Sequence, residues 1–340
     1  MPYRKAAKHR EYLFGMDRFC NITIRGISAG CDNTRKNGSE KILINQPGFY
    51  IGKDKTKVAY LTKNLNRIKD KQDHAAVAVW RNRMNFLTAV HTDIGIKKST
   101  NQDSALVTEA QTDCGRVLLS VICDGMGGLA KGEVASATVI KAFGDWFEKE
   151  LPKLLHAEEP EKVIFGEWEE LIMDCNRRIS AYADRFGVSM GTTLNAALFM
   201  KDRYYLINIG DSRAYLISNG VYQLTKDQSY VQREVDLGHI TPEEAETHPQ
   251  RNLLLQCVGA SPVITPDYYT GAYESGQVFM QCSDGFRHTV TPEEMYEYLN
   301  GSVLKDEQTM VQNAVYLTEL NKSRRETDNI TVVLVKMTEE

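Results

Sequence analysis

Five short acidic motifs, most of them at the ends of strand-like apolar runs, constrain this chain more than any other feature. They are Asn101-Gln102-Asp103, Asp124-Gly125-Met126-Gly127-Gly128, Gly210-Asp211-Ser212-Arg213, Ser283-Asp284-Gly285 and Asp328-Asn329-Ile330-Thr331. A carboxylate at a strand end is held by a rigid element while its side chain points into a loop. Several carboxylates directed at one place repel one another unless cations lie between them. Because oxygen ligands suit hard divalent ions, the motifs predict a Mg2+ or Mn2+ site.

Each motif also has a purely structural explanation. Asp and Gly are common turn residues, so a single motif of this kind is better explained by a turn. Five motifs in succession, with strands and helices between them, favour a shared site instead.

Composition narrows the class of protein. The chain has 340 residues, enough for one large domain with an extension or for two domains, and its 42% hydrophobic and 25% charged residues are typical of a soluble globular protein. No apolar run reaches the roughly 18 to 20 residues of a membrane span, and no apolar segment follows the basic N-terminus as in a secretory signal. The seven cysteines form no C-x-x-C pair, which predicts a reducing, cytoplasmic location.

Charge is distributed unevenly along the chain. The net charge is -4, but residues 1–83 contain 18 Lys+Arg against 7 Asp+Glu, so residues 84–340 are strongly acidic. The basic segment therefore has either an electrostatic role, towards an acidic partner or the chain's own acidic domain, or the role of a solvated arm. We expect no nucleic-acid partner and no membrane span.

Periodicity predicts alternating groups of strands and helices. The predicted strands are Lys41–Asn45, Phe49–Ile51, Met84–Val90, Val117–Cys123, Thr192–Met200, Tyr204–Ile209, Arg213–Ile217, Val278–Cys282 and Asn329–Lys336. The predicted helices are Glu133–Leu155, Pro160–Phe186, Ser229–Leu237, two capped helices beginning after Thr241 and Thr291, and Glu307–Ser323. This pattern indicates a layered α+β domain.

The order and spacing of the motifs, from about Phe86 to Met337, resemble the metal-dependent protein phosphatase family, also called the protein phosphatase 2C family. The resemblance implies an α+β four-layer αββα sandwich, two antiparallel sheets flanked by helices. It also implies a serine/threonine phosphoprotein phosphatase that uses two, or with a third site three, Mn2+ or Mg2+ ions and a metal-activated water. Its partners would be phosphorylated proteins, the products of protein kinases. Met126 stands where animal and plant relatives carry His, which indicates a bacterial type.

The resemblance also implies roles for individual residues. Asp124 would be the ligand shared by two metal ions, with the carbonyl of Gly125 beside it. Asp284 and Asp328 would complete the shell of the first ion. Asp211 matches the position that holds a third, weaker ion together with Asp284, and a turn joining two strands is the alternative explanation of Asp211.

Two positions depart from the family pattern. Lys98 stands where an Arg usually binds the substrate phosphate, and it supplies the charge without the bidentate fork. Lys97 is the alternative phosphate-binding residue, but the alternation of side chains along a strand places it on the face opposite to Lys98. Gln102 stands where a Glu often binds metal through water, so we expect it to offer an oxygen without a charge. Asp103 beside it is the more secure residue of the ligand shell, and we also count it among the catalytic residues.

The segment before residue 84 has its own alternatives. Gly48–Lys53 followed by Asp73-His74-Ala75 resembles the start of a forkhead-associated domain, whose remainder is missing. We favour a basic N-terminal extension at 1–83 and a phosphatase domain at 84–340. Two rival functions remain: a degenerate phosphatase that binds phosphoproteins without turnover, and a switch phosphatase for one dedicated regulatory partner.

Overall fold

The computed structural model describes the backbone of residues 23–29 and the residues 84–127 and 131–339. The strands expected at Lys41–Asn45 and Phe49–Ile51, and the segment that resembles a forkhead-associated domain, lie outside these described residues. None of the described helices is long and apolar enough to cross a membrane.

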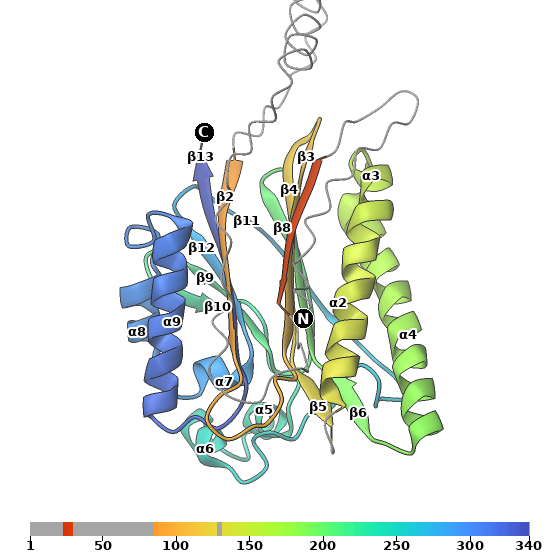
Figure 1. The fold of residues 1–340 in the computed structure, drawn as a ribbon, viewed down its shortest axis with the longest axis vertical. Coiled ribbons are helices and arrows are strands. Elements are labelled where there is room, and N and C mark those ends of the chain that lie inside the picture. Colours follow the sequence, from red (N-terminus) through yellow and green to blue (C-terminus); the bar gives the residue numbers. More distant parts are fainter. Residues whose placement is uncertain (1–22, 30–83, 128–130, 340) are drawn as a thin grey trace, which may run out of the picture. The chain divides into compact units, whose positions relative to one another are not determined.

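Two antiparallel sheets form the centre of the domain (Figure 1). One has the strand order β1-β3-β4-β7-β8-β11, with bounds Thr23–Ala29, Ser104–Thr112, Gly115–Cys123, Leu194–Met200, Arg203–Ile209 and Asp267–Ala272. The other has the order β10-β9-β12-β13-β2, with bounds Val221–Gln223, Arg213–Ile217, Val278–Cys282, Ile330–Glu339 and Met84–Asp93. The short strands β5 (Gly125–Gly127) and β6 (Met190–Thr192) pair with each other.

Helices cover both outer faces of the pair of sheets, as Figure 1 shows. The first sheet is covered by α2 (Gly132–Lys149), α3 (Leu151–Leu154) and α4 (Pro160–Phe186). The second is covered by α8 (Pro292–Leu299) and α9 (Glu307–Ser323). Three short helices, α5 (Tyr230–Asp236), α6 (Pro242–Thr247) and α7 (Asp284–Arg287), lie in connections between strands. The predicted αββα sandwich is therefore confirmed.

The apolar pattern of β4 explains why the sheets lie between helices. Leu119 and Val121 belong to the core under α2 and α4, whereas Leu118 belongs to the core between the two sheets, with Phe199 and Phe279. Since successive side chains of a strand point to opposite faces, a strand buried on both faces reads as one continuous apolar run. Each such fully buried side chain contributes roughly 1.5 to 3 kcal/mol of transfer free energy.

Several predicted elements differ from the observed ones. The helix expected over Glu133–Leu155 is divided at Glu150, because Pro152 cannot continue the hydrogen-bonding pattern of α2 and instead stands in the first turn of α3. The strand expected over Thr192–Met200 is β6 and β7 separated by Thr193. Strands β3 and β11 were not predicted. Strand β1 lies within residues 1–83 and pairs with β3 along its whole length.

The strand register brings the acidic motifs to one end of the sandwich. In the first sheet, Ser104 at the start of β3 pairs with Cys123 at the end of β4. In the second, Ile330 at the start of β13 pairs with Asp93 at the end of β2. Cys282, at the end of β12, likewise pairs with Arg213 at the start of β9. The motifs that flank these residues therefore lie next to one another.

Candidate metal centre

Asp124 lies between β4 and β5 on a backbone held from both sides. Its N–H donates to Oγ1 of Thr193 at 2.8 Å, and its carbonyl accepts from the N–H of Thr193 at 2.9 Å. The N–H of the next residue, Gly125, donates to the carbonyl of Gln102 at 3.2 Å. A Cβ at Gly125 would lie 2.3 Å from the carbonyl oxygen of Gly132, so only glycine is accommodated there. The position of the Asp124 carboxylate thus depends on this close approach of two backbones.

Asp103, immediately before β3, is almost completely buried. Its Oδ2 accepts from Oγ of Ser283 at 2.9 Å and from Oγ1 of Thr331 at 2.6 Å, so it joins the two sheets. Its Oδ1 is buried and makes no hydrogen bond. Burial raises the pKa of Asp103 to about 7, although the two hydroxyl hydrogen bonds act in the opposite direction.

Asp284 and Asp328 come from the second sheet and are joined through His288 and Glu326. Asp284 is the first residue of α7, and its Oδ1 is buried without a hydrogen bond. Nε2 of His288 lies 3.6 Å from Oδ2 of Asp284, and Nδ1 lies 3.1 Å from Oε2 of Glu326. Oε1 of Glu326 accepts the N–H of Asp328 at 2.9 Å. His288 and Glu326 thereby connect Asp284 to the backbone of Asp328.

Asp211 lies in the turn between β8 and β9 and faces the partly buried Arg287. Nη2 of Arg287 is 3.9 Å from Oδ2 of Asp211 and donates to its carbonyl at 3.2 Å. Arg287 and Arg213 are both held by Asp227. Burial, and next the charge of Asp284, raise the pKa of Asp211 to about 7 despite the nearby guanidinium.

The loop after β2 carries Lys98 to the same place. Nζ of Lys98 is 2.8 Å from Oδ1 of Asp328. Nδ2 of Asn329 donates to the carbonyls of Ile94 and Thr100, and its Oδ1 accepts the N–H of Gln102. Asn329 therefore fixes the loop that carries Lys98 and the segment that leads to Asp103. Lys97 is exposed on the same loop.

The electrostatics show that the carboxylates share one site. The pKa of Asp124 is raised well above its usual range, by burial first and then by the charges of Asp103 and Asp284. Each proton or cation that enters relieves this repulsion. The two orphaned oxygens, Oδ1 of Asp103 and Oδ1 of Asp284, lack only an electropositive partner. A set of carboxylate and carbonyl oxygens without sulfur or imidazole ligands fits Mg2+ or Mn2+.

The structure brings together the side chains that the sequence singles out, and it adds others. One lysine and five aspartates lie close together, namely Lys98, Asp103, Asp124, Asp211, Asp284 and Asp328. Sequence reasoning missed Arg287, His288 and Glu326. A signal was present for the first two, since they follow Asp284 by three and four residues and so lie on its side of a helix. Gln102 contributes its backbone to the turn at Gly125.

Comparison with known proteins gives concordant results. A profile of the family described as protein phosphatase 2C matches residues 95–318. The serine/threonine phosphatase stp of Listeria monocytogenes serovar 1/2a is 36% identical over 251 residues, which are 72% of this chain and 93% of that protein. The serine/threonine protein phosphatase PstP of Mycobacterium tuberculosis is 35% identical over 249 residues, 72% of this chain and 44% of that longer protein.

Solved structures match the same region. Serine/threonine phosphatase Stp1 of Staphylococcus aureus superposes with a TM-score of 0.63 at 30% identity, over 78% of this chain and 98% of that one. The catalytic domain of PstP in complex with two manganese ions gives a TM-score of 0.61 at 30% identity, over 75% of this chain and 100% of that one.

Proposed function

The chain belongs to the protein phosphatase 2C family and is a metal-dependent serine/threonine phosphatase of the bacterial type, and we propose that its clustered aspartates form the active site. The observation that carries this proposal is the pair of buried carboxylate oxygens, on Asp103 and Asp284, to which no group in the described part of the chain donates a hydrogen bond. Its substrates are phosphorylated proteins, and its cofactor is Mn2+ or Mg2+.

The electrostatic interaction of the carboxylates supports a set of metal ligands. Asp124, which interacts electrostatically with the four other aspartates, and the carbonyl of Gly125 would hold two ions. Asp284 and Asp328, from the second sheet, would hold one of them as well. Asp211, which interacts electrostatically with Asp284, would hold a third ion. Gln102, which is half-buried beside this turn, would contribute an oxygen through water.

The surrounding residues orient and neutralise the site. When bound, a pair of divalent ions supplies positive charge for the phosphoryl oxygens and lowers the pKa of the attacking water. Ser283 and Thr331 hold Asp103 by hydrogen bonds, so that its free oxygen keeps one direction. Nε2 of His288 lies 3.6 Å from Oδ2 of Asp284 and, when protonated, attracts that carboxylate without a hydrogen bond. Asp103, whose hydrogen bonds join the two sheets, would accept a proton from the nucleophile or orient it.

Lys98 is the substrate-binding residue of this proposal. Burial alone lowers its pKa, but the hydrogen bond and charge of Asp328 outweigh burial and keep the ammonium charged. It is 39% exposed, so a phosphoryl group arriving from solvent can reach it. With a metal ion held by Asp328, the ammonium of Lys98 would be released from Asp328 and could contact the substrate phosphate instead.

The decisive experiment is hydrolysis of p-nitrophenyl phosphate with Mn2+ and with excess EDTA. We expect turnover with Mn2+ or Mg2+ and none with EDTA. Phosphoserine and phosphothreonine peptides should also be hydrolysed. Full activity in EDTA would exclude the metal mechanism, and binding of a phosphopeptide without turnover in Mn2+ would indicate a degenerate phosphatase.

For residues 1–83 we propose an extension that contacts an acidic partner or the acidic catalytic domain, on the strength of its excess of basic residues. We also propose a cytoplasmic location. The cysteines of the described residues, namely Cys114, Cys123, Cys175, Cys257 and Cys282, are all free thiols, which suits a reducing compartment.

A further inference from the structure

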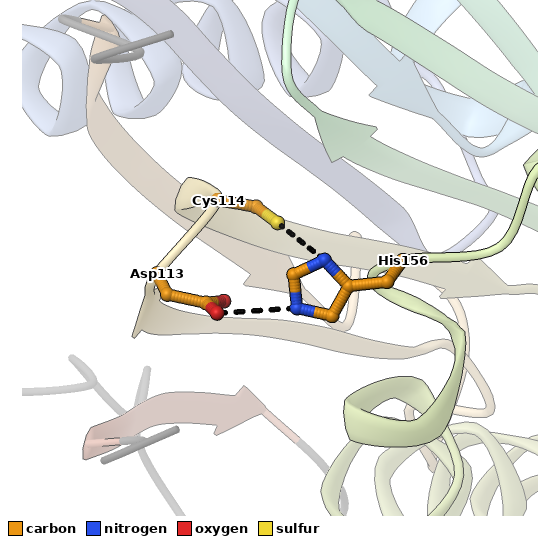
Figure 2. A group of neighbouring side chains, drawn as sticks. All are labelled: Asp113, Cys114 and His156. Carbon is orange, nitrogen blue, oxygen red and sulfur yellow. Dashed lines mark hydrogen bonds and ion pairs between the residues drawn. The ribbon is translucent and has the colours of Figure 1, made fainter. Parts of the chain in front are cut away.

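A second cluster of metal-binding side chains consists of Asp113, Cys114 and His156. Their ligand atoms all lie within 4.8 Å of one another. Sγ of Cys114 is 3.6 Å from Nδ1 of His156, and Nε2 of His156 is 3.1 Å from Oδ2 of Asp113. Figure 2 shows the imidazole ring between the other two side chains, with one ring nitrogen directed at each.

We propose that Cys114 and His156 bind a zinc ion, or another borderline divalent transition metal, with Asp113 holding the imidazole in position. Thiolate sulfur and imidazole nitrogen select ions of this class, whereas Mg2+ and Mn2+ prefer oxygen. On binding, Cys114 releases its thiol proton to solvent and solvent completes the coordination. This site is separate from the phosphatase site and from the ions that serve catalysis.

The distances suit one ion between two ligands. Zinc binds sulfur at about 2.3 Å and nitrogen at about 2.0 to 2.1 Å, so two ligands at a tetrahedral angle lie about 3.6 Å apart. The observed separation of Sγ and Nδ1 is 3.6 Å. The other ring nitrogen then carries a hydrogen that it donates to Asp113. A carboxylate in this position fixes the tautomer and direction of a metal-binding histidine.

Rigid neighbours hold both ligands. Cys114 lies in the tight turn between β3 and β4, where its N–H donates to Oγ1 of Thr112 at 3.1 Å. His156 follows Leu155, which is buried in the core, and the N–H of Ala157 donates to the carbonyl of Leu154. An ion at this place would link the β3–β4 turn to the segment after α3, two parts of the chain that are about forty residues apart.

The cluster lies at the opposite end of the sheet from the aspartates. Strand β4 begins at Gly115 beside Cys114 and ends at Cys123 beside Asp124. Nine residues of extended strand span about 30 Å. The two sites therefore do not share ligands.

A nucleophilic thiol is the main alternative for a Cys–His–Asp group. Such a role needs a lowered thiol pKa. Burial, and then the charge of Asp113, raise the pKa of the Cys114 thiol, while the charge of Lys201 acts in the other direction. A free nucleophilic thiolate is therefore not favoured at Cys114, whereas the 3.6 Å separation of Sγ and Nδ1 of His156 suits one shared ion.

The test is a Co2+ titration of the full chain in the presence of Mg2+, which occupies the oxygen-ligand site. Thiolate coordination gives a near-ultraviolet charge-transfer band that oxygen ligands do not produce. We expect the band to saturate at one equivalent of Co2+ and to be removed by Zn2+. Cys114→Ser should abolish it, and His156→Ala and Asp113→Asn should weaken Co2+ binding by about 10- to 100-fold.

Matched variants distinguish metal binding at this site from binding at other cysteines and from a general loss of folding. His239→Ala is the histidine control, because Nδ1 of His239 contacts Glu234 at 2.8 Å with no cysteine in the group. Cys20→Ser and Cys31→Ser control for the two cysteines outside the described residues. Hydrolysis of p-nitrophenyl phosphate in Mn2+ should be unchanged in Cys114→Ser and His156→Ala, which shows that these variants fold. Absence of the band in the wild type, or its persistence in Cys114→Ser, would overturn the proposal.

Discussion

Nζ of Lys98 lies 2.8 Å from Oδ1 of Asp328, so the cation expected to bind substrate is paired with a carboxylate expected to bind metal. The pair is partly exposed, and its two members belong to loops that Asn329 ties together. Metal and phosphate would each replace one partner of this ion pair. Binding of the cofactor at Asp328 and binding of the substrate at Lys98 are therefore expected to favour each other.

Replacement of Lys98 tests this relationship. We expect Lys98→Ala to raise KM for p-nitrophenyl phosphate about tenfold or more, because one charge-assisted contact to the phosphate is lost. Lys98→Arg should preserve or lower KM, since a planar fork suits phosphate better. Lys97→Ala, on the exposed neighbouring position, is the matched control. A large effect at Lys97 with none at Lys98 would transfer the role to Lys97.

Loss of a metal-binding carboxylate should abolish turnover. We expect Asp124→Asn and Asp284→Asn each to reduce kcat on the order of a hundredfold or more at saturating substrate. The melting temperature in EDTA should not fall, because each substitution removes one of several repelling charges. Asp174→Asn, on the exposed face of α4, should leave both quantities unchanged. Near wild-type rates in either site variant would show that the site is misplaced.

The metal-free protein should lose stability as the pH rises. Asp103 and Asp211 have a pKa of about 7 in the folded state, against about 3.9 in an unfolded chain. Between these values the folded state binds more protons, so the free energy of unfolding decreases as pH increases through this window. We expect the melting temperature in EDTA to be several degrees higher at pH 5.5 than at pH 8.

Saturating Mn2+ should remove most of this decline, since the ions neutralise the same carboxylates. Asp103→Asn should flatten the pH dependence measured in EDTA. A melting temperature in EDTA that rises steadily from pH 5.5 to pH 8 would contradict the assignment of buried, proton-binding carboxylates.

Much of the fold was predictable because the central strands of both sheets are apolar. Helices α4 and α9 and strands β9 and β12 have the predicted bounds, since their apolar periodicity runs to capping or turn residues. Strand β3 was missed because Thr108, Glu109 and Gln111 interrupt its apolar pattern. Its partner β1 was missed because Thr23–Ala29 has little periodicity, and only pairing with β3 defines it as a strand.

Only those residues of the metal site that belong to the acidic motifs could be predicted from the sequence. Asp103, Asp124, Asp211, Asp284 and Asp328 each stand in a short local pattern. Arg287 and Glu326 act through partners far away in sequence, such as Asp227 and His288, and these contacts arise only after folding. Cys114 and His156 escaped notice for the same reason.

Substitutions of Gly125 and Gly166 test whether the close backbone contact at Gly125 is needed for activity, with Gly166 as the matched control. A Cβ at Gly125 would lie 2.3 Å from a carbonyl oxygen, whereas nothing lies within 4 Å of a Cβ at Gly166 in α4. We expect Gly125→Ala to lose most activity and stability, because the turn carrying Asp124 must move. Gly166→Ala should keep activity and gain about 0.5 to 1 kcal/mol from helix propensity. Normal kinetics in Gly125→Ala would show that the turn can accommodate a Cβ without displacing Asp124.

Truncation separates the two contributions of the N-terminal segment. Deletion of residues 1–80 removes β1 and exposes the hydrogen-bonding edge of β3, whereas deletion of residues 1–20 retains β1. All proposed catalytic side chains lie beyond residue 84, so both truncated proteins should hydrolyse p-nitrophenyl phosphate. The longer deletion should lower the melting temperature and promote association through the exposed strand edge.

Turnover of a phosphoprotein should fall more than turnover of the small ester in both deletions, because the small ester needs only the metal site. This difference should shrink at high salt, since salt screens contacts between the basic segment and acidic surfaces beyond about 8 to 10 Å. Phosphoprotein turnover that is unchanged by either deletion would leave residues 1–83 without an electrostatic role. Loss of activity towards both substrates in the longer deletion alone would make β1 a structural part of the catalytic domain.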